Sequence, residues 1–292
     1  MTMAMSEVTK TGTDATLTST TDSRGFLGDL THPTCPIPKY AYQGKEQFLK
    51  DFQHARDTIQ PCSEWLLLTK VTNEIFHADF LESEEHPFSN VSSYNKQLEI
   101  LLLRIVVSKP HAAAVHEFGL LLHNATSRHG VKLRAYGGYH SAADWGKIPD
   151  EAWRPLRLPK DRSLDWPSVV LEVSFSETRE KLMSDIRHWL GASGGDVKVV
   201  FTVAIERHAP KVIIEQWVMK NSRERREQRI EITKSGPEVE VSKDALELSF
   251  ERIFLCPPST DGEAIISVHG PALKSFAEAI WEQQGFISVQ RI

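Results

Sequence analysis

Apolar positions along the chain recur with two different periods, and each change of period marks an element of the fold. Spacings of three and four predict helices, as over Gly44 to Ile59, where Phe48, Phe52 and Ala55 recur. Short β-branched runs bounded by turn residues predict strands. We expect four of these runs to share one sheet: Gln97 to Ser108, Val131 to Tyr136, Ser168 to Phe175 and Val197 to Ile205.

Two amphipathic helices are expected to cover this sheet, and a third follows near the end of the chain. One runs from His111 to His129, one starts near Glu177, and the last runs from Pro271 to Gln283. The apolar faces predicted for the first two helices contain Ala114, Val115, Phe118, Leu121, Leu122, Leu182, Ile186, Trp189 and Leu190.

The remaining segments are less regular. Glu64 to Thr72 suits either a strand or a short helix, and Glu82 to Tyr94 is an acidic loop by composition. Lys211 to Met219 is predicted to form a hairpin with the preceding strand, across a turn that contains Pro210. The charged stretch Arg223 to Arg229 is typical of a solvated loop, with short β-like pieces such as Arg229 to Thr233 after it. Together these elements predict an α/β fold.

Composition restricts the class of protein. The 292 residues are 40% hydrophobic and 25% charged, as in ordinary globular domains, and the net charge of −5 excludes a generally basic nucleic-acid coat. The three cysteines fit no zinc spacing, and no apolar run is long enough to span a bilayer. We expect residues 1–25 to be a disordered tail, residues 26–292 to form one domain, and the protein to be cytoplasmic.

One carboxylate lies where a charge is costly. Glu172 interrupts the apolar run of the third predicted strand, and Asp150 follows Pro149 in a loop 22 residues earlier. A buried carboxylate requires a cation, a metal ion or a hydrogen-bond network as its partner. An Asp at one strand end and a Glu on the neighbouring strand can converge on one point, so the pair is a candidate site.

These motifs resemble the PD-(D/E)XK restriction-endonuclease-like superfamily, in its compact branch with the pattern PD, then EVxS. The resemblance covers about residues 94–219 and rests on Pro149-Asp150, Glu172-Val-Ser174 and Lys181, preceded by Ser108-Lys-Pro-His111 and Lys147-Ile-Pro-Asp150. It implies a restriction-endonuclease-like core with a mixed sheet flanked by helices, and a peripheral extension over 220–292. Ser174 stands where the nuclease pattern has Lys, and Lys181 is the candidate replacement.

Within this superfamily the chain is similar to the fungal arginine-containing cyclodipeptide synthases of secondary metabolism. That similarity implies an aminoacyltransferase that joins arginine from arginyl-tRNA to a second amino acid from another charged tRNA, as a diketopiperazine. It needs no cofactor, which agrees with the absence of a P-loop motif. The implied catalytic residues are Asp150, Glu172, Ser174 and Lys181, and the implied substrate-binding residues are Glu151, Trp153 and Asp185.

Two alternatives stay open beside the synthase. In a Mg²⁺-dependent nuclease, Asp150 and Glu172 would hold the metal; in a non-catalytic nucleic-acid-binding relative, the fold would persist without chemistry. Loss of the Lys at position 174 favours the synthase, because paired carboxylates can clamp a guanidinium. Five cations are candidates for contact with nucleic-acid phosphates: Lys220, Arg223, Arg225, Arg226 and Arg229.

Each candidate also has a purely structural interpretation. Asp150 is a common turn residue after proline, and Lys181 with Asp185 are typical of a solvated helix face. Ser174 is more typical of a hydrogen-bonded strand end than of a nucleophile. His111 is typical of a polar residue at a helix start, and the charged stretch 223–229 is interleaved with Glu.

Overall fold

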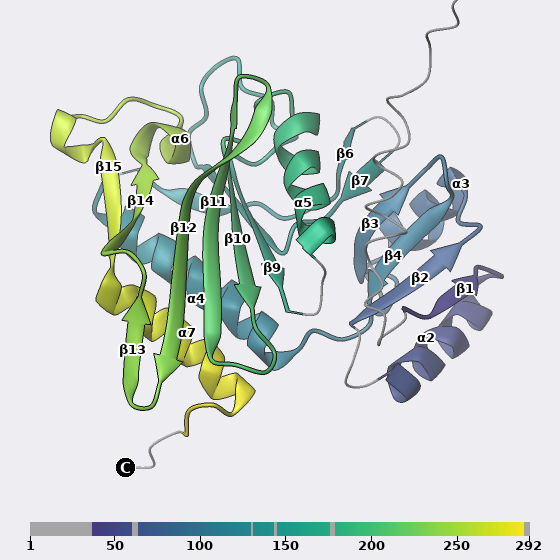
Figure 1. Cartoon of the computed structure of the whole chain (residues 1–292). Helices are drawn as coiled ribbons and strands as arrows, with labels where there is room; N and C mark the ends of the chain where they lie inside the picture. Colours follow the sequence, from purple (N-terminus) through teal and green to yellow (C-terminus); the bar gives the residue numbers. More distant parts are fainter. Residues whose placement is uncertain (1–36, 60–63, 130, 143–144, 176–178, 289–292) are drawn as a thin grey trace, which may run out of the picture.

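A computed structural model describes residues 37–59, 64–129, 131–142, 145–175 and 179–288. Within these ranges the backbone forms three β-sheets flanked by helices, and two of the sheets contain both parallel and antiparallel pairs (Figure 1). This confirms the predicted α/β class with a mixed sheet. The predicted tail and positions 176–178, where the second helix was expected to start, lie outside the described residues.

The largest sheet has seven strands in the order β13-β12-β11-β10-β9-β8-β5. Strands β9 and β10 run parallel and are joined through α5 (Arg179–Arg187), whereas the other neighbours are antiparallel. β5, β8, β9 and β10 thus form the mixed core that the resemblance implies. The strands are β5 (Leu133–Ala135), β8 (Glu151–Pro155), β9 (Val169–Ser174), β10 (Val199–Ile205), β11 (Lys211–Lys220), β12 (Arg223–Ser235) and β13 (Glu238–Val241).

A second sheet of six strands lies beside the first, in the order β1-β2-β4-β3-β7-β6 (Figure 1). Only β1 and β2 are parallel in it. The strands are β1 (Lys39–Ala41), β2 (Trp65–Thr69), β3 (Val91–Asn95), β4 (Ile100–Arg104), β6 (His140–Ala142) and β7 (Trp145–Lys147).

The helices and a small two-stranded sheet complete the fold. β14 (Ala245–Ser249) pairs with β15 (Ile265–His269). The helices are α2 (Lys45–Ile59), α3 (Asn73–Ile75), α4 (Lys109–Thr126), α5, α6 (Phe250–Phe254) and α7 (Gly270–Gln284), with the π-helical turns η1 (Phe76–Leu81) and η3 (His188–Ala192) and the 3-10 turns η2 (Ser127–His129) and η4 (Asp261–Glu263).

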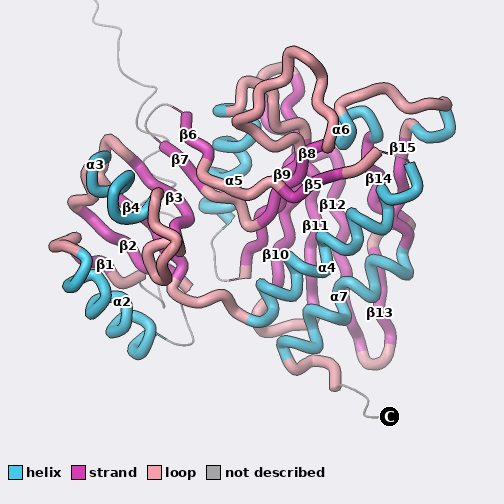
Figure 2. The backbone as a smooth tube through the Cα atoms, turned by 180° about the vertical axis from the view of Figure 1, so that it is seen from behind, coloured by secondary structure: helices cyan, strands magenta, loops and turns pink. Residues whose placement is uncertain are grey.

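Apolar side chains cover both faces of the seven-stranded sheet. Helices α4 and α7 lie side by side on one face (Figure 2), where Phe118 packs 5.2 Å from Phe201 and 6.1 Å from Phe276, measured between ring centroids. Trp189 and Leu182 cover the other face. The predicted apolar faces of both helices are therefore confirmed. The six-stranded sheet has its own apolar cluster against α2 and η1.

The prediction that four strands share one sheet is wrong for the first of them. β4 belongs to the six-stranded sheet, whereas β5, β9 and β10 lie in the seven-stranded one. Leu101 and Leu103 face one apolar cluster and Ile100 and Leu102 face another, so the run is buried on both sides. A continuous apolar run cannot reveal which sheet contains it.

Several predicted boundaries also change. The strand expected over 97–108 is limited to 100–104, because residues 96–99 form a turn in which Asn95 Oδ1 accepts from the Leu98 amide and Glu99 has a positive φ of 52°. The segment 64–72 contains a strand, and the expected loop over 82–94 ends in β3. The charged stretch 223–229 is not a loop: it begins β12, whose Ile230 and Ile232 are fully buried.

The small sheet offers a direct test of the packing. Ile266 is 3% exposed against the main core, and its neighbour Ile265 is 50% exposed. We expect Ile266→Ala to lower the free energy of unfolding by about 2–5 kcal/mol, and Ile265→Ala by less than about 0.5 kcal/mol. Urea unfolding of both variants measures the difference, and equal losses would show that this ribbon does not pack as described.

Candidate active site

Asp150 is held at the start of β8, next to Glu172 on the adjoining strand. The register pairs Glu151 with Leu171, so the position before β8 adjoins Glu172 on β9. Asp150 Oδ2 accepts a hydrogen bond of 2.7 Å from the Val173 amide, which fixes the carboxylate against β9.

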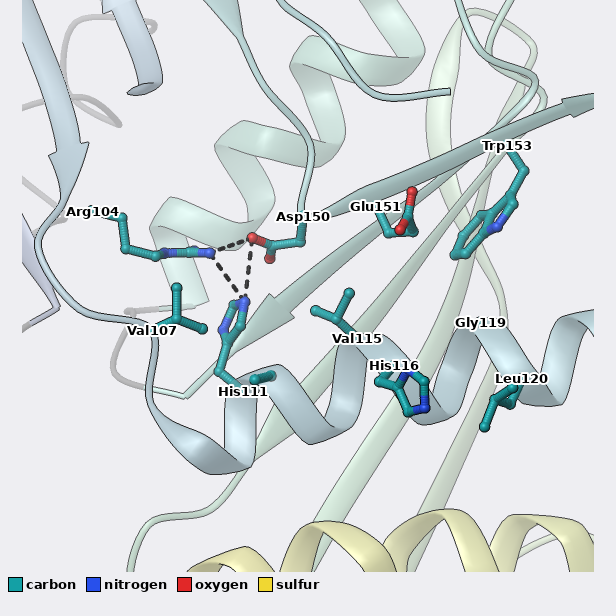
Figure 3. Close-up of a pocket in the computed structure, with 11 residues that line it drawn as sticks. Arg104, Val107, His111, Val115, His116, Gly119, Leu120, Asp150, Glu151 and Trp153 are labelled. Atoms are coloured by element: carbon teal, nitrogen blue, oxygen red, sulfur yellow. Dashed lines mark hydrogen bonds and ion pairs between the residues drawn. The ribbon is translucent and has the colours of Figure 1, made fainter. Parts of the chain in front are cut away.

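Arg104 and His111 approach the other oxygen of Asp150 (Figure 3). Arg104 Nη1 lies 2.6 Å from Asp150 Oδ1 and 3.0 Å from His111 Nε2, and His111 Nε2 lies 3.4 Å from the same Oδ1. Burial raises the pKa of Asp150, but the charges of Arg104 and His111 outweigh it and hold that pKa well below its usual value. Asp150 is therefore a carboxylate at neutral pH.

The start of α4 positions His111. Ser108 is the N-cap, and its Oγ accepts from the His111 amide at 3.4 Å. The Ser108 amide in turn donates to Oε1 of the buried Glu64 at 3.0 Å, directly before β2. Glu64 thus ties the end of this helix to the six-stranded sheet.

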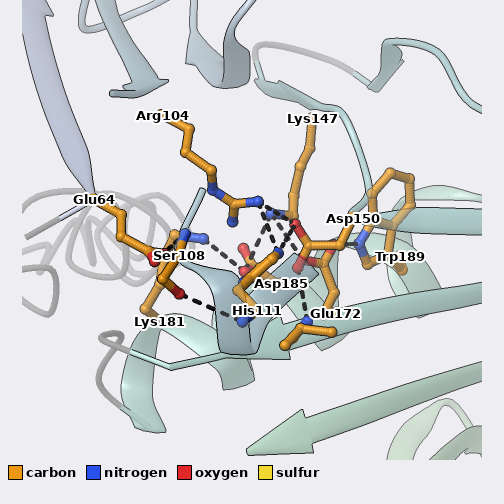
Figure 4. Close-up of polar contacts among 11 residues, drawn as sticks. Glu64, Arg104, Ser108, His111, Lys147, Asp150, Glu172, Lys181, Asp185 and Trp189 are labelled. Carbon is orange, nitrogen blue, oxygen red and sulfur yellow. Dashed lines mark hydrogen bonds and ion pairs between the residues drawn. The ribbon is translucent and has the colours of Figure 1, made fainter. Parts of the chain in front are cut away.

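Glu172 lies deeper, among donors on every side (Figure 4). Its Oε1 accepts a 2.6 Å hydrogen bond from Trp189 Nε1, and its Oε2 lies 3.3 Å from Lys147 Nζ. Burial raises the pKa of Glu172 to about 8 although Lys147 opposes the shift, and the charges of Asp185 and Asp150 add to the rise.

Lys147, Asp185 and Lys181 complete this cluster. Asp185 Oδ2 lies 3.2 Å from Lys147 Nζ and 2.6 Å from Lys181 Nζ, and all three residues are at most 2% exposed. Lys181 Nζ also lies 5.7 Å from the ring centroid of Trp65 on β2. We call Lys147, Glu172, Lys181 and Asp185 the inner charge network.

The structure brings four predicted site residues together: Asp150, Glu172, Lys181 and Asp185. The interpretation of Lys181 and Asp185 as a solvated helix face is wrong, because the six-stranded sheet covers that side of α5. Ser174 ends β9 in a buried position. Glu151 is half-buried with its Oε1 on the neighbouring Ala152 amide, and Trp153 is buried 6.2 Å from Phe118.

Sequence reasoning missed the cations and the indole donor of this site. Lys147 stands only three residues before Asp150, which was a usable signal. Arg104 interrupts the apolar run 100–107, and a lone charge there also deserved a partner. Trp189 follows the apolar face of its helix and gave no sign of its hydrogen bond.

Two cavities open on Asp150. One of about 520 Å³ is lined by residues that include Arg104, His111, His116, Glu151 and Trp153 (Figure 3). The other, of about 360 Å³, extends along 90–92 and 105–107. Arg104, Val107 and Asp150 line both, whereas no member of the inner charge network lines either. A substrate in these cavities meets Arg104 and Asp150.

The five cations expected to contact nucleic acid are largely engaged within the protein. Arg226 and Arg229 lie 2.6 Å and 3.5 Å from Glu215 Oε1, and Arg229 also pairs with Glu231. Lys220, Arg223 and Arg225 are exposed at the β11–β12 hairpin.

A magnesium site at Asp150 and Glu172 is what the nuclease resemblance implies, and the donor set does not fit it. All four carboxylate oxygens accept from Arg104, the Val173 amide, Trp189 or Lys147. A divalent ion there would lie against two protein cations. Among the described residues, no group of three or more His, Cys, Asp or Glu side chains is arranged to hold a metal.

Comparisons with known proteins identify no family. No protein-family model and no curated protein matches the chain. Among solved structures it is similar to a protein from Anabaena variabilis ATCC 29413 described as a "putative nuclease belonging to DUF820", with 16% identity, coverage of 64% of this chain and 90% of that one, and a TM-score of 0.36. Likeness at this level identifies no activity. No helix among the described residues is long and apolar enough to cross a membrane.

The raised pKa of Glu172 makes stability depend on pH. Between its usual value of 4.5 and about 8, the folded chain keeps a proton that the unfolded chain releases, so this residue's contribution to stability falls as pH rises through that window. We expect Glu172→Gln to flatten the decline in unfolding free energy, measured by urea titrations from about pH 5 to 8.5. Glu180→Gln, on the exposed side of α5, is the control; an unchanged profile in Glu172→Gln would contradict the assignment.

Proposed function

We propose that the chain is a nuclease-like enzyme that cleaves a phosphodiester bond at Arg104, His111 and Asp150. The observation that carries this proposal is the pair of cavities that meet at Arg104 and Asp150. Two hollows on either side of one cation suit a polymer that continues in both directions from its reacting group. The PD and EVxS motifs beside this groove support the same class of substrate.

Arg104 is the group that would receive the phosphate. Its guanidinium is 16% exposed, so the side chain is held by Asp150 yet reachable from the groove. Arginine binds phosphate oxygens through paired donors and stabilises the charge that develops on them in the transition state.

His111 is the candidate base. A guanidinium can only donate, so the 3.0 Å contact directs the lone pair of His111 Nε2 towards Arg104 Nη1 and places the proton of the neutral ring on Nδ1. When a phosphate draws the guanidinium away, Nε2 becomes free to take a proton from the attacking hydroxyl. Asp150 then acts as the positioning residue that keeps Arg104 and His111 together.

Cleavage of fluorescent single-stranded RNA, single-stranded DNA and duplexes tests this proposal. We expect cleavage that persists in EDTA, a fall in kcat/KM of about 10²–10⁴-fold in His111→Gln, and a loss of about 10-fold or more in Arg104→Lys, which keeps the charge but not the fork. The matched control is His123→Gln, an exposed histidine on the same helix, with unchanged activity.

Either of two results would count against the nuclease. One is the absence of cleavage in every substrate, with or without Mg²⁺. The other is cleavage that His111→Gln and His123→Gln reduce equally, because a contaminating or distant activity would explain it.

The arginine-containing cyclodipeptide synthase is a second candidate, favoured by the metal-free groove with two adjoining cavities. Two aminoacyl groups need two such spaces, and their ester bonds are already activated. The expected guanidinium clamp must move, however, because Arg104 and Lys147 already pair with Asp150 and Glu172. Glu151, half-buried in the larger cavity, is the carboxylate available for a substrate guanidinium.

Charged tRNAs distinguish the two candidates. A cyclic arginyl dipeptide detected by mass spectrometry after incubation with arginyl-tRNA and a second charged tRNA, and its loss in Glu151→Gln, would support the synthase. Cleavage of oligonucleotides without any such product would support the nuclease.

A further inference from the structure

A basic surface lies at the β5 edge of the seven-stranded sheet, away from the cations singled out in the sequence. Residues 131–136 and 154–167 contain six basic and two acidic residues, in a chain whose net charge is −5. The first segment contains β5, and the second is the end of β8 with the loop that leads to β9 (Figure 2).

The pleat of β5 gathers three of these side chains on one face. Lys132, Arg134 and Tyr136 alternate with Leu133, which packs against the main core, and Ala135. β5 is the terminal strand of the sheet, so its outer edge has no neighbour among the described strands. Lys132 and Arg134 are exposed.

A second arginine faces this row from β8. Arg154 stands directly opposite Arg134 in the antiparallel register. Like charges directly opposite each other on neighbouring strands are destabilising, unless an anion lies between them. The charge of Arg154 also acts on the loop: burial first, and then Arg154, lowers the pKa of Arg162.

Aromatic rings accompany these charges. The guanidinium carbon of Arg154 lies 3.8 Å from the ring centroid of Tyr136, and both side chains bond to the Leu164 carbonyl. The ring of His140 lies 5.7 Å from Tyr136 and stacks on the half-buried Trp166 at 5.3 Å. Flat cationic and aromatic groups are the surfaces on which unpaired bases stack.

We propose that Lys132, Arg134, Tyr136 and Arg154, the platform, bind a single-stranded stretch of nucleic acid. Lys132 and Arg134 contact phosphates, and a base stacks on the Tyr136–Arg154 pair. Charge complementarity identifies the occupant as a polyanion, and the stacked pair favours bases that are not already paired in a duplex.

This inference rests on the proposed function and names where its substrate is held. β8 connects the two places, because Asp150 precedes the strand and Arg154 lies four residues later, about 13 Å along an extended backbone. A strand bound to the platform therefore lies within a few nucleotides of the groove.

Fluorescence anisotropy with oligonucleotides of about 12 nucleotides tests the platform. We expect Arg134→Ser/Arg154→Ser to weaken binding of single-stranded RNA or DNA by about tenfold or more and to reduce the steepness of the salt dependence by about 1.4, or about 0.7 per lost phosphate contact. The matched control, Arg223→Ser/Arg225→Ser, removes the same charge from the exposed β11–β12 hairpin and should change binding by less than about threefold.

Two further variants separate a binding role from a folding role. Lys132→Ser/Arg134→Ser removes two exposed side chains and should weaken binding as well, with an unchanged melting temperature. Tyr136→Leu should weaken single strands by about tenfold while the salt dependence stays the same, because only stacking is lost.

Equal effects of the platform and hairpin variants would overturn the proposal. So would unaffected oligonucleotide binding together with binding to phosphatidylserine vesicles that Leu156→Ser/Leu164→Ser abolishes, which would identify a membrane surface instead. Loss of binding in the platform variants from a protein that cleaves nothing would refute the nuclease and leave the platform standing. Cleavage by a protein whose platform variants bind normally would do the reverse.

Discussion

The pairing of charges across two sheets is the interaction on which the site depends. The six-stranded sheet and its β4–β3–β7 strands supply the cations Arg104 and Lys147, and the seven-stranded sheet supplies the carboxylates Asp150 and Glu172. Each of these charges would be costly alone in the interior. Because each sheet satisfies the other, the groove above Asp150 exists only where the two sheets meet.

The site has an exposed layer and an enclosed one, and this division decides which residues can react. Arg104 and Asp150 line both cavities, whereas the inner charge network is closed to solvent. The motif residues Glu172 and Lys181 therefore support the site from behind, and the chemistry falls to residues that the motif does not contain.

The sequence predicted what depends on local pattern. The buried strand with Glu172, the apolar faces of α4 and α5, and the β10–β11 hairpin all follow from periodicity. It could not predict the sheet to which β4 belongs, because an apolar run buried on both faces is the same in either sheet. For the same reason the partners of Asp150 stayed hidden: Arg104 lies 46 residues away and meets Asp150 only when both sheets form.

A double-mutant cycle on Arg104 and Asp150 tests this account most directly. The free energy of unfolding is measured for Arg104→Met, Asp150→Asn, the double variant and the unmodified chain. If the buried pair joins the sheets, each single change costs about 3–5 kcal/mol, and the double variant costs less than their sum by about 1–3 kcal/mol. Additive losses would contradict the account, because the two side chains would then stabilise the fold independently of each other.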